Sequence, residues 1–370
     1  MVIEVLFYFT LFFSIITTLV SAYNFLTAPR FENNQKEISN KPLVSILIPA
    51  RNEEKNISQI IDDIIKQTYK NFELIILDDE SEDKTAEIIS DKISEYNSNN
   101  KIKLISGKPL PNGWLGKNWA CHQLSKEANG EYLLFIDADV RLSSGVVESC
   151  LFYKNKYKLE MISSFPTQII NSFGEWLIVP LMNFLLLAFL PLKKVYSSAN
   201  KSFIAANGQF LFIAKSAYEK IGGHLTFKER VVEDMEIARQ VKKSGFNMMT
   251  FLGADSVSCR MYDGFGHAFN GFSKNYFPGF NTSPIIFFLF LAFLFTTYFL
   301  PFLMIFMNSS FVLIVLIILL GRLAISVSSR QTILVNILLH PVQMLIMITI
   351  GVNSVYKTKT KKLKWKGRSI

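Results

Sequence analysis

Cysteine and histidine are scarce in this chain of 370 residues. The three cysteines, Cys121, Cys150 and Cys259, are far apart, odd in number and without a C-x-x-C pair, so they support neither a disulfide framework nor a zinc ribbon. The four histidines lack the H-E-x-x-H spacing that places two imidazoles on one face of a helix. Any metal ion is therefore expected to have oxygen ligands, and the cysteine usage fits a reducing compartment.

Two signature loops of nucleotide binding are also missing. The sequence has no G-x-G-x-x-G loop and no G-K-[ST] loop, so it indicates neither a dinucleotide-binding fold nor a P-loop. The net charge of +9 does not indicate nucleic acid, because basic residues concentrate only at residues 357–368 and no nucleic-acid module is present. A basic tail beside an apolar segment is typical of a tail that faces anionic lipid at the cytoplasmic surface.

Charged residues are rare at positions 5–27 and 285–352, and hydrophobic residues make up 50% of the whole chain. Residues 5–27 are apolar and long enough to cross a bilayer, which predicts a transmembrane helix. A secretory signal peptide is the alternative, but the run lacks a basic start and is longer than a usual signal core. Arg30, Lys36 and Lys41 follow the run and favour a cytoplasmic soluble domain.

Three further apolar runs lie after residue 284. Residues 285–306 and 311–327 are separated by a short polar turn and predict a helical hairpin. The third run, 332–352, carries Asn336, His340 and Pro341 near its middle. Four full crossings would leave the lysine-rich tail outside, against the positive-inside rule, so we expect the third run to be broken or re-entrant.

The expected organisation follows from these breaks in composition. We predict a transmembrane helix at residues 1–28, a catalytic domain at 40–275, a membrane region at 283–356 and a basic cytoplasmic tail at 357–370. One more apolar run, at 173–192, lies inside the catalytic domain and contains two prolines. An interfacial helix is favoured there over a full span. The protein is thus expected in the cell membrane as a multi-pass protein with its catalytic domain in the cytoplasm.

Strand and helix patterns alternate through the soluble domain. Short β-type runs at 44–49, 72–77, 102–105 and 132–136 alternate with helix-period segments at 53–67, 84–96 and 117–128. This order predicts an α/β domain with a mostly parallel sheet, whose ligands bind at the carboxyl ends of the strands. Residues 49–53, 78–81 and 137–139 each follow a strand, so we expect them to share one crevice.

Acidic side chains at these strand ends are the candidates for chemistry. Asp137 and Asp139 flank a small residue and can both reach Mg²⁺ or Mn²⁺, although a turn after a strand also favours Asp for capping alone. Asp79, the second acid of an adjacent pair, is a candidate acceptor of hydrogen bonds from a nucleoside. Asp234 precedes a helical run from residue 235 to 244, where an ionised carboxylate is stabilised; it is either an N-cap or a general base.

Four motifs in this order resemble the inverting family 2 glycosyltransferases of the GT-A fold. They are residues 48–53 (IPARNE), 77–83 (LDDESED), 137–139 (DAD) and 233–234 (ED), within a match that covers about residues 42–275. The resemblance implies a nucleoside site at Asp79, a metal-diphosphate site at Asp137 and Asp139, and a base at Asp234. Glu80 stands where the family usually has glycine, and the Q-x-x-R-W signature of processive synthases is missing, which favours a single transfer.

Residues 113–122 (GWLGKNWACH) and 365–368 (WKGR) are similar to segments of membrane enzymes that glycosylate carotenoids. The tail segment could close over the donor or lie at the membrane surface. Acceptor contacts are expected from Asn207, Gln209 and Glu233. The matched motifs imply that nucleotide-sugar binding falls on Pro49, Glu53, Asp79, Lys117, Asp137, Arg260, Trp365 and Arg368.

The implied reaction transfers one sugar, with UDP-glucose the expected donor, to a carotenoid acid or hydroxyl in the membrane. The implied cofactor is a divalent cation. Transfer to polyprenyl phosphate or another glycolipid precursor would use the same donor site, and a catalytically inactive membrane scaffold is an alternative of another class. Retention of Asp79, Asp137, Asp139 and Asp234 counts against the scaffold.

Overall fold

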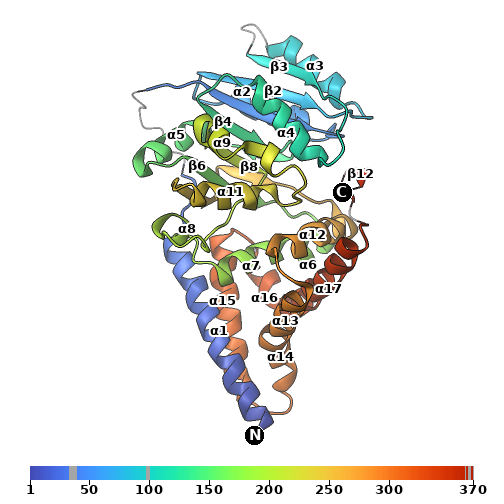
Figure 1. The fold of residues 1–370 in the computed structure, drawn as a ribbon. Helices are drawn as coiled ribbons and strands as arrows, with labels where there is room; N and C mark the ends of the chain where they lie inside the picture. The colour runs from blue at the N-terminus through green and yellow to red at the C-terminus, as the bar shows by residue number, and fades with distance from the viewer. Residues whose placement is uncertain (33–39, 97–100, 363, 366–367, 370) are drawn as a thin grey trace.

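A central sheet of seven strands carries the soluble part of the molecule (Figure 1). The computed structural model describes residues 1–32, 40–96, 101–362, 364–365 and 368–369. The strand order is β3-β2-β1-β4-β8-β6-β9, and β8 alone runs antiparallel to its two neighbours, β4 and β6. The strands are β1 (Val44–Ala50), β2 (Phe72–Asp78), β3 (Ile102–Ser106), β4 (Tyr132–Ile136), β6 (Met161–Phe165), β8 (Phe210–Ala214) and β9 (Met248–Leu252). The predicted mostly parallel sheet is confirmed.

Both faces of this sheet are buried, which explains why its strands read as continuous apolar runs. Along β1, Ile46 and Ile48 join one core cluster whereas Leu47 joins the other, as the period of two in a strand requires. The covering helices are α2 (Ile57–Ile65), α3 (Thr85–Tyr96), α4 (Gly116–Glu127), α5 (Val146–Tyr157), α9 (Lys215–Lys220), α10 (Gly223–Thr226) and α11 (Glu233–Lys243). The parallel strands β1 and β2 are in register at their carboxyl ends, where Ala50 lies opposite Asp78.

The helix expected to begin at residue 53 instead begins at Ile57. The residues before it form a loop that is hydrogen-bonded to the loop after β2: the Glu53 N–H donates to the Thr85 hydroxyl and the Glu54 N–H to Asp83. These long-range bonds replace the first turn of the predicted helix. A second sheet has three strands, β5 (Val140–Leu142), β10 (Val257–Cys259) and β7 (Thr167–Gln168). Its first strand, β5, directly follows the turn at residues 137–139.

Three helices in the described part of the chain are long and apolar enough to cross a membrane. They are α1 (Val2–Thr27), the segment Pro284–Met304 and α15 (Phe311–Ser328); the second is built from α13 (Pro284–Leu294), a π-helical turn η1 (Phe295–Phe299) and α14 (Leu300–Met304). In Figure 1, α1 and α15 run side by side below the sheet. The buried residues of α1 are small or polar and include Ser14 and Asn24, a composition typical of helix contacts inside a bilayer.

The last apolar run is broken at Leu339 into α16 (Ile333–Leu338) and α17 (His340–Lys359), where the sequence predicts a break. Both ends of this segment meet the soluble domain: Arg330 pairs with Asp255, and Lys357 donates to Asn270. In between, His340 packs against Phe302 of α14. The two helices therefore leave the soluble domain and return to it, so that the C-terminus lies far from the N-terminus (Figure 1).

Further helices lie between the sheet and the apolar helices. They are α6 (Phe173–Ile178), α7 (Pro180–Phe189), α8 (Lys194–Ser197) and α12 (Gly264–Phe280). Pro180 stands at the first position of α7, where its missing N–H is not needed, so residues 173–192 form two main helices rather than one. The Asn24 amide donates to the carbonyls of Leu187 and Leu190, which ties the end of α7 to α1. Placement of these helices at a membrane surface stays a prediction.

Candidate active site

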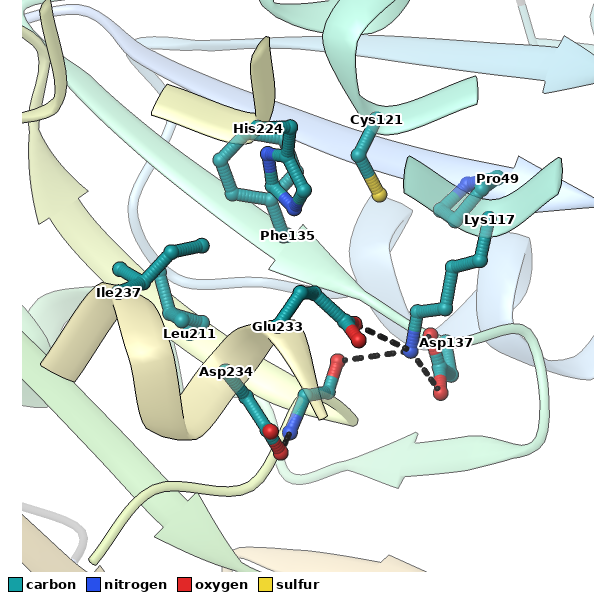
Figure 2. Close-up of a pocket in the computed structure, with 11 residues that line it drawn as sticks. Pro49, Lys117, Cys121, Phe135, Asp137, Leu211, His224, Glu233, Asp234 and Ile237 are labelled. Atoms are coloured by element: carbon teal, nitrogen blue, oxygen red, sulfur yellow. Dashed lines mark hydrogen bonds and ion pairs between the residues drawn. The ribbon is translucent and has the colours of Figure 1, made fainter. Parts of the chain in front are cut away.

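A small pocket opens where β1 and β4 end and α11 begins (Figure 2). Its polar wall brings together Lys117, Asp137, Glu233 and Asp234 from three separate elements. Of the strand-end residues that the sequence placed in one crevice, Pro49 and Asp137 line this pocket, whereas Glu53, Asp79 and Asp139 do not. Pro49, Cys121, Phe135, Gly208, Leu211, His224 and Ile237 complete the lining.

Lys117 is the cation of the pocket. It lies in the first turn of α4, and its Nζ is 2.6 Å from Asp137 Oδ1 and 3.9 Å from Glu233 Oε1. Burial opposes the charge, but Asp137 and Glu233 outweigh burial and raise the pKa of Lys117. A Cβ added at Gly208 would lie 3.3 Å from this Nζ and 3.2 Å from Glu233 Oε1, so glycine allows the backbone to approach both charges.

The carboxylate of Asp139 has few contacts that stabilise its negative charge. Its two oxygens accept long hydrogen bonds, both 3.4 Å, from the Gln209 amide, and a hydrogen bond from the Cys259 thiol also favours the ionised form. Burial, reinforced by the charges of Asp137 and Glu53, raises the pKa of Asp139 to about 7. In the described chain no three His, Cys, Asp or Glu side chains form a metal cluster. Two carboxylates that repel each other still fit a divalent cation whose other ligands are phosphate oxygens and water.

Asp234 occupies the first turn of α11, as predicted. Its Oδ2 accepts from the Gly208 N–H at 2.7 Å and its Oδ1 from the Met235 N–H at 2.8 Å. Burial raises the pKa of Asp234, while these two backbone donors act in the opposite direction. Burial also raises the pKa of its neighbour Glu233, to about 7. Two backbone donors thus hold the Asp234 carboxylate in place in the pocket lining.

Asp79 lies outside this pocket, and the C-terminal tail covers it. Arg368 Nη1 is 2.6 Å from Asp79 Oδ2, and its other terminal nitrogen pairs with Glu80. Asp79 Oδ1 is buried and has no partner within the described residues. Glu80 adopts φ 55°, a left-handed conformation that suits glycine better. The departure from glycine at this position therefore supplies the second acid that binds Arg368.

The other predicted site residues are placed differently. Arg260 pairs with the buried Glu175 at 3.1 Å and with Asp263 at 3.3 Å. Gln209 donates to Cys259 Sγ at 2.9 Å. Asn207 and Gln209 are buried beside the pocket rather than in its lining. The Trp365 side chain lies outside the described residues, although its backbone pairs with that of Arg368 in the short β11 (Lys364–Trp365) and β12 (Arg368–Ser369) ribbon.

Sequence reasoning missed Lys274, on α12. Its ammonium makes no hydrogen bond or ion pair within the ranges that the structure describes, and the charges of Glu233, Asp137 and Asp234 act on it. Burial, aided by the charge of Lys117, lowers the pKa of Lys274. An isolated lysine in a segment rich in aromatic residues was the available signal. Lys274 adds a second cation to the surroundings of the pocket, from the side of α12.

Comparison with known proteins gives consistent matches. Residues 45–221 match the model of glycosyl transferase family 2. A 4,4'-diaponeurosporenoate glycosyltransferase of Staphylococcus haemolyticus is 26% identical over 63% of this chain and 60% of its own length. The protein of the same name from Staphylococcus aureus strain USA300 is 27% identical over 65% of this chain and 62% of its own length. This chain therefore spans less than two thirds of the length of these relatives.

One solved structure shares the fold over nearly the whole chain. It is the mannosyltransferase PcManGT from Pyrobaculum calidifontis in complex with GDP-Man and Mn²⁺, with a TM-score of 0.59 and 14% identity. The superposition covers 96% of this chain and 98% of that one. At this identity the likeness concerns the fold alone. The α/β fold of the GT-A type is thereby confirmed.

Proposed function

Because residues 45–221 of this chain match the model of glycosyl transferase family 2, we propose that it is an inverting enzyme of this family that transfers one sugar from a nucleotide sugar to a lipid acceptor. The observation that carries the proposal is the pocket in which Lys117, Asp137 and Asp234 meet at the ends of the parallel strands. UDP-glucose is the proposed donor. The names of the relatives support a carotenoid acid or hydroxyl as acceptor.

In the proposed reaction an acceptor oxygen forms a bond to the anomeric carbon while the bond to the nucleoside diphosphate breaks. Asp137 and Asp139 would hold a divalent cation, Mg²⁺ or Mn²⁺, which neutralises charge on the diphosphate when bound. Lys117 stabilises the same leaving group through a charge-assisted contact. Asp234 takes the proton of an acceptor hydroxyl, with its carboxylate oriented by the Gly208 and Met235 N–H groups. Attack opposite the leaving group inverts the anomeric configuration.

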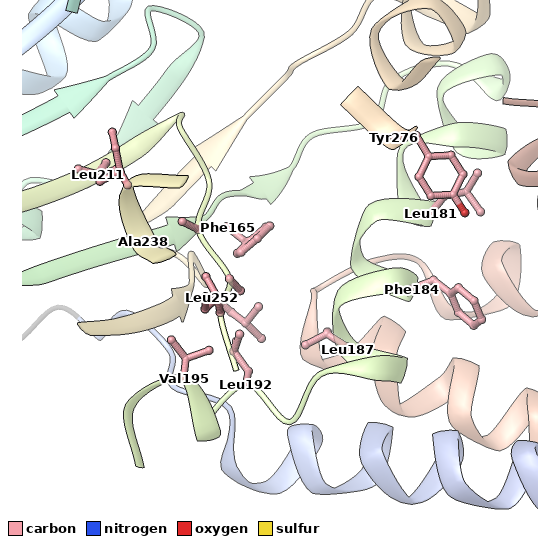
Figure 3. Close-up of a cluster of buried hydrophobic side chains, with 14 of the residues drawn as sticks. Phe165, Leu181, Phe184, Leu187, Leu192, Val195, Leu211, Ala238, Leu252 and Tyr276 are labelled. Carbon is pink, nitrogen blue, oxygen red and sulfur yellow. The ribbon is translucent and has the colours of Figure 1, made fainter. Parts of the chain in front are cut away.

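The apolar surroundings of the pocket support a lipid acceptor. Leu211 and Ile237 line the pocket and belong to the same buried cluster as Phe184 and Leu187 of α7. Figure 3 shows this cluster extending from the sheet to the helices below it. Lys274 supports an acceptor that carries negative charge, such as a carotenoid carboxylate. A carboxylate needs no base, and Asp234 would then position it.

Three helices could span a membrane, and we propose a multi-pass protein whose catalytic domain and tail both lie in the cytoplasm. The contact of Arg368 with Asp79 supports a tail on the same side as the catalytic domain. The return of α16 and α17 to the soluble domain supports a segment that does not cross.

Labelled UDP-glucose should distinguish the acceptors directly. Membranes that contain the protein are incubated with the labelled donor and separate lipid classes, and the products are identified by mass spectrometry. We expect a labelled carotenoid glycoside or glycosyl ester in wild-type membranes and none in Asp139→Asn membranes. Labelling of polyprenyl phosphate alone would contradict the carotenoid acceptor. If metal-dependent donor turnover is absent with every lipid class, the result would support the inactive scaffold instead.

The Arg368→Gln variant tests whether the tail belongs to the donor site. Arg368 holds Asp79 through Oδ2, and Oδ1, which has no partner within the described residues, is left to accept a hydrogen bond from the nucleoside. We expect the donor KM to rise about tenfold, the value of one charge-assisted hydrogen bond, with little change in kcat. Lys359→Gln removes one positive charge from an exposed position of the same tail region and should change neither constant. A lower donor KM in Arg368→Gln would instead mean that the tail blocks the site.

A further inference from the structure

A positively charged side chain is buried among the apolar helices and forms no ion pair within the described residues. Arg322 of α15 is fully buried, and its only described hydrogen bonds run from Nη2 to the neutral amides of Asn336, at 3.2 Å, and Gln343, at 2.7 Å. No Asp or Glu follows Asp263 in the sequence, so the C-terminal helices cannot supply an acid. A charge in such surroundings is costly and commonly marks a binding function.

Unpartnered polar atoms gather around this guanidinium. Arg322 Nε and Nη1 have no partner in the described parts of the chain, and neither nitrogen of His340 forms a hydrogen bond of normal geometry there. Both side chains face the ring of Phe184, with the guanidinium 5.4 Å and the imidazole 5.8 Å from its centre. Figure 3 shows Phe184 extending from α7 on the side of the C-terminal helices. The ring face favours a cation, but it cannot provide hydrogen bonds to these donors.

The depth of Arg322 suits a lipid headgroup. The helix continues to Ser328, about 9 Å further along its axis, and Arg330 just beyond pairs with Asp255 of the soluble domain. The guanidinium thus lies close beneath the level at which the apolar helices meet the soluble domain. Nε–H and Nη1 point to opposite sides of the guanidinium, so each can donate a separate charge-assisted hydrogen bond to an anionic oxygen.

We propose that Arg322, assisted by His340, binds the phosphate of an anionic membrane phospholipid. The lipid phosphate supplies the missing negative charge and accepts a hydrogen bond from Nε or from Nη1. Its acyl chains lie along the apolar helices. This site is separate from the sugar-transfer pocket, so it stands or falls independently of the proposed reaction.

Lipid retention tests the site. Wild-type protein, Arg322→Met and the control Arg330→Met are reconstituted in nanodiscs of phosphatidylglycerol or phosphatidylcholine, and retained lipid is measured by native mass spectrometry. Arg330 is the control because it is a half-exposed arginine of the same region. We expect wild type and Arg330→Met to retain phosphatidylglycerol over phosphatidylcholine. Arg322→Met should retain about tenfold less phosphatidylglycerol, as the loss of one charge-assisted hydrogen bond implies.

Three results would overturn the proposal. They are equal retention by Arg322→Met, equal retention of the two lipids by wild type, and displacement of the lipid by inorganic phosphate, which would mean that the site takes a soluble anion. If Arg322→Met does not fold, wild-type protein with labelled arginine provides the answer by solid-state NMR. A dipolar coupling between lipid phosphorus and a guanidinium nitrogen is expected, and its loss in nanodiscs of phosphate-free lipid should follow. Absence of the coupling in phosphatidylglycerol would refute the site.

Discussion

Asp234→Asn is expected to lower kcat on the order of a thousandfold with an alcohol acceptor, the range observed for loss of a general base. The amide keeps the shape of the carboxylate and its place at the start of α11, but it cannot take a proton. Donor binding should persist, because the proposed donor contacts are made by other residues of the pocket, such as Asp137. The Asp234 oxygens instead accept hydrogen bonds from Gly208 and Met235. Steady-state kinetics with each substrate varied separately measures both effects.

The acceptor determines how this result is interpreted. A carboxylate acceptor is already ionised, so Asp234→Asn should then slow transfer much less than it does with an alcohol. Glu236→Gln, which neutralises an acid in the same helical turn outside the pocket lining, is the matched control and should keep wild-type kcat. A kcat of Asp234→Asn equal to that of this control with an alcohol acceptor would exclude Asp234 as the base. Since burial raises the pKa of Asp234, wild-type turnover should decline as the pH is lowered and this acid becomes protonated.

Local patterns predicted the strands β1 to β4, the helices α2, α3, α4 and α11 and the acids at the strand ends, but not β6, β8 and β9 of the same sheet. These features depend on hydrophobic period and on turn chemistry, both of which are written within a few neighbouring residues. The start of α2 was predicted wrongly because the bonds from Glu53 and Glu54 to the loop after β2 have no local signature. The break at Leu339 was predictable because Pro341 and two polar residues interrupt an apolar run.

Long-range pairings limited the prediction of the site. Arg260 was expected at the diphosphate, but the buried Glu175 on α6 binds it, and nothing near either residue in the sequence signals that pair. Lys274 was overlooked because the acids whose charges act on it, Asp137 after β4 and Glu233 and Asp234 on α11, lie far away in the chain. The tail was expected to close over the donor or to lie on the membrane. Only the fold reveals that Arg368 reaches Asp79 and Glu80.

Asp139→Asn is expected to abolish metal-dependent donor turnover while stabilising the metal-free protein. Folding raises the pKa of Asp139 to about 7, so its ionisation destabilises the fold. The penalty is absent below the pKa of the unfolded chain, grows as the pH rises and is complete above about 7. At about pH 8 the metal-free variant should therefore unfold at a higher temperature than metal-free wild type. Differential scanning calorimetry measures this difference.

Added Mn²⁺ should reverse the order of the two unfolding temperatures, because the ion stabilises only a protein that binds it. Wild type should gain unfolding temperature with added Mn²⁺, and Asp139→Asn should not. Binding requires the ionised carboxylate, so below the pKa of about 7 the apparent Mn²⁺ affinity of wild type should fall about tenfold for each unit of pH. Asp91→Asn, an exposed acid of α3, should respond to Mn²⁺ as wild type does. If Mn²⁺ stabilises Asp139→Asn as strongly as wild type, the ion binds elsewhere and Asp139 is a structural carboxylate.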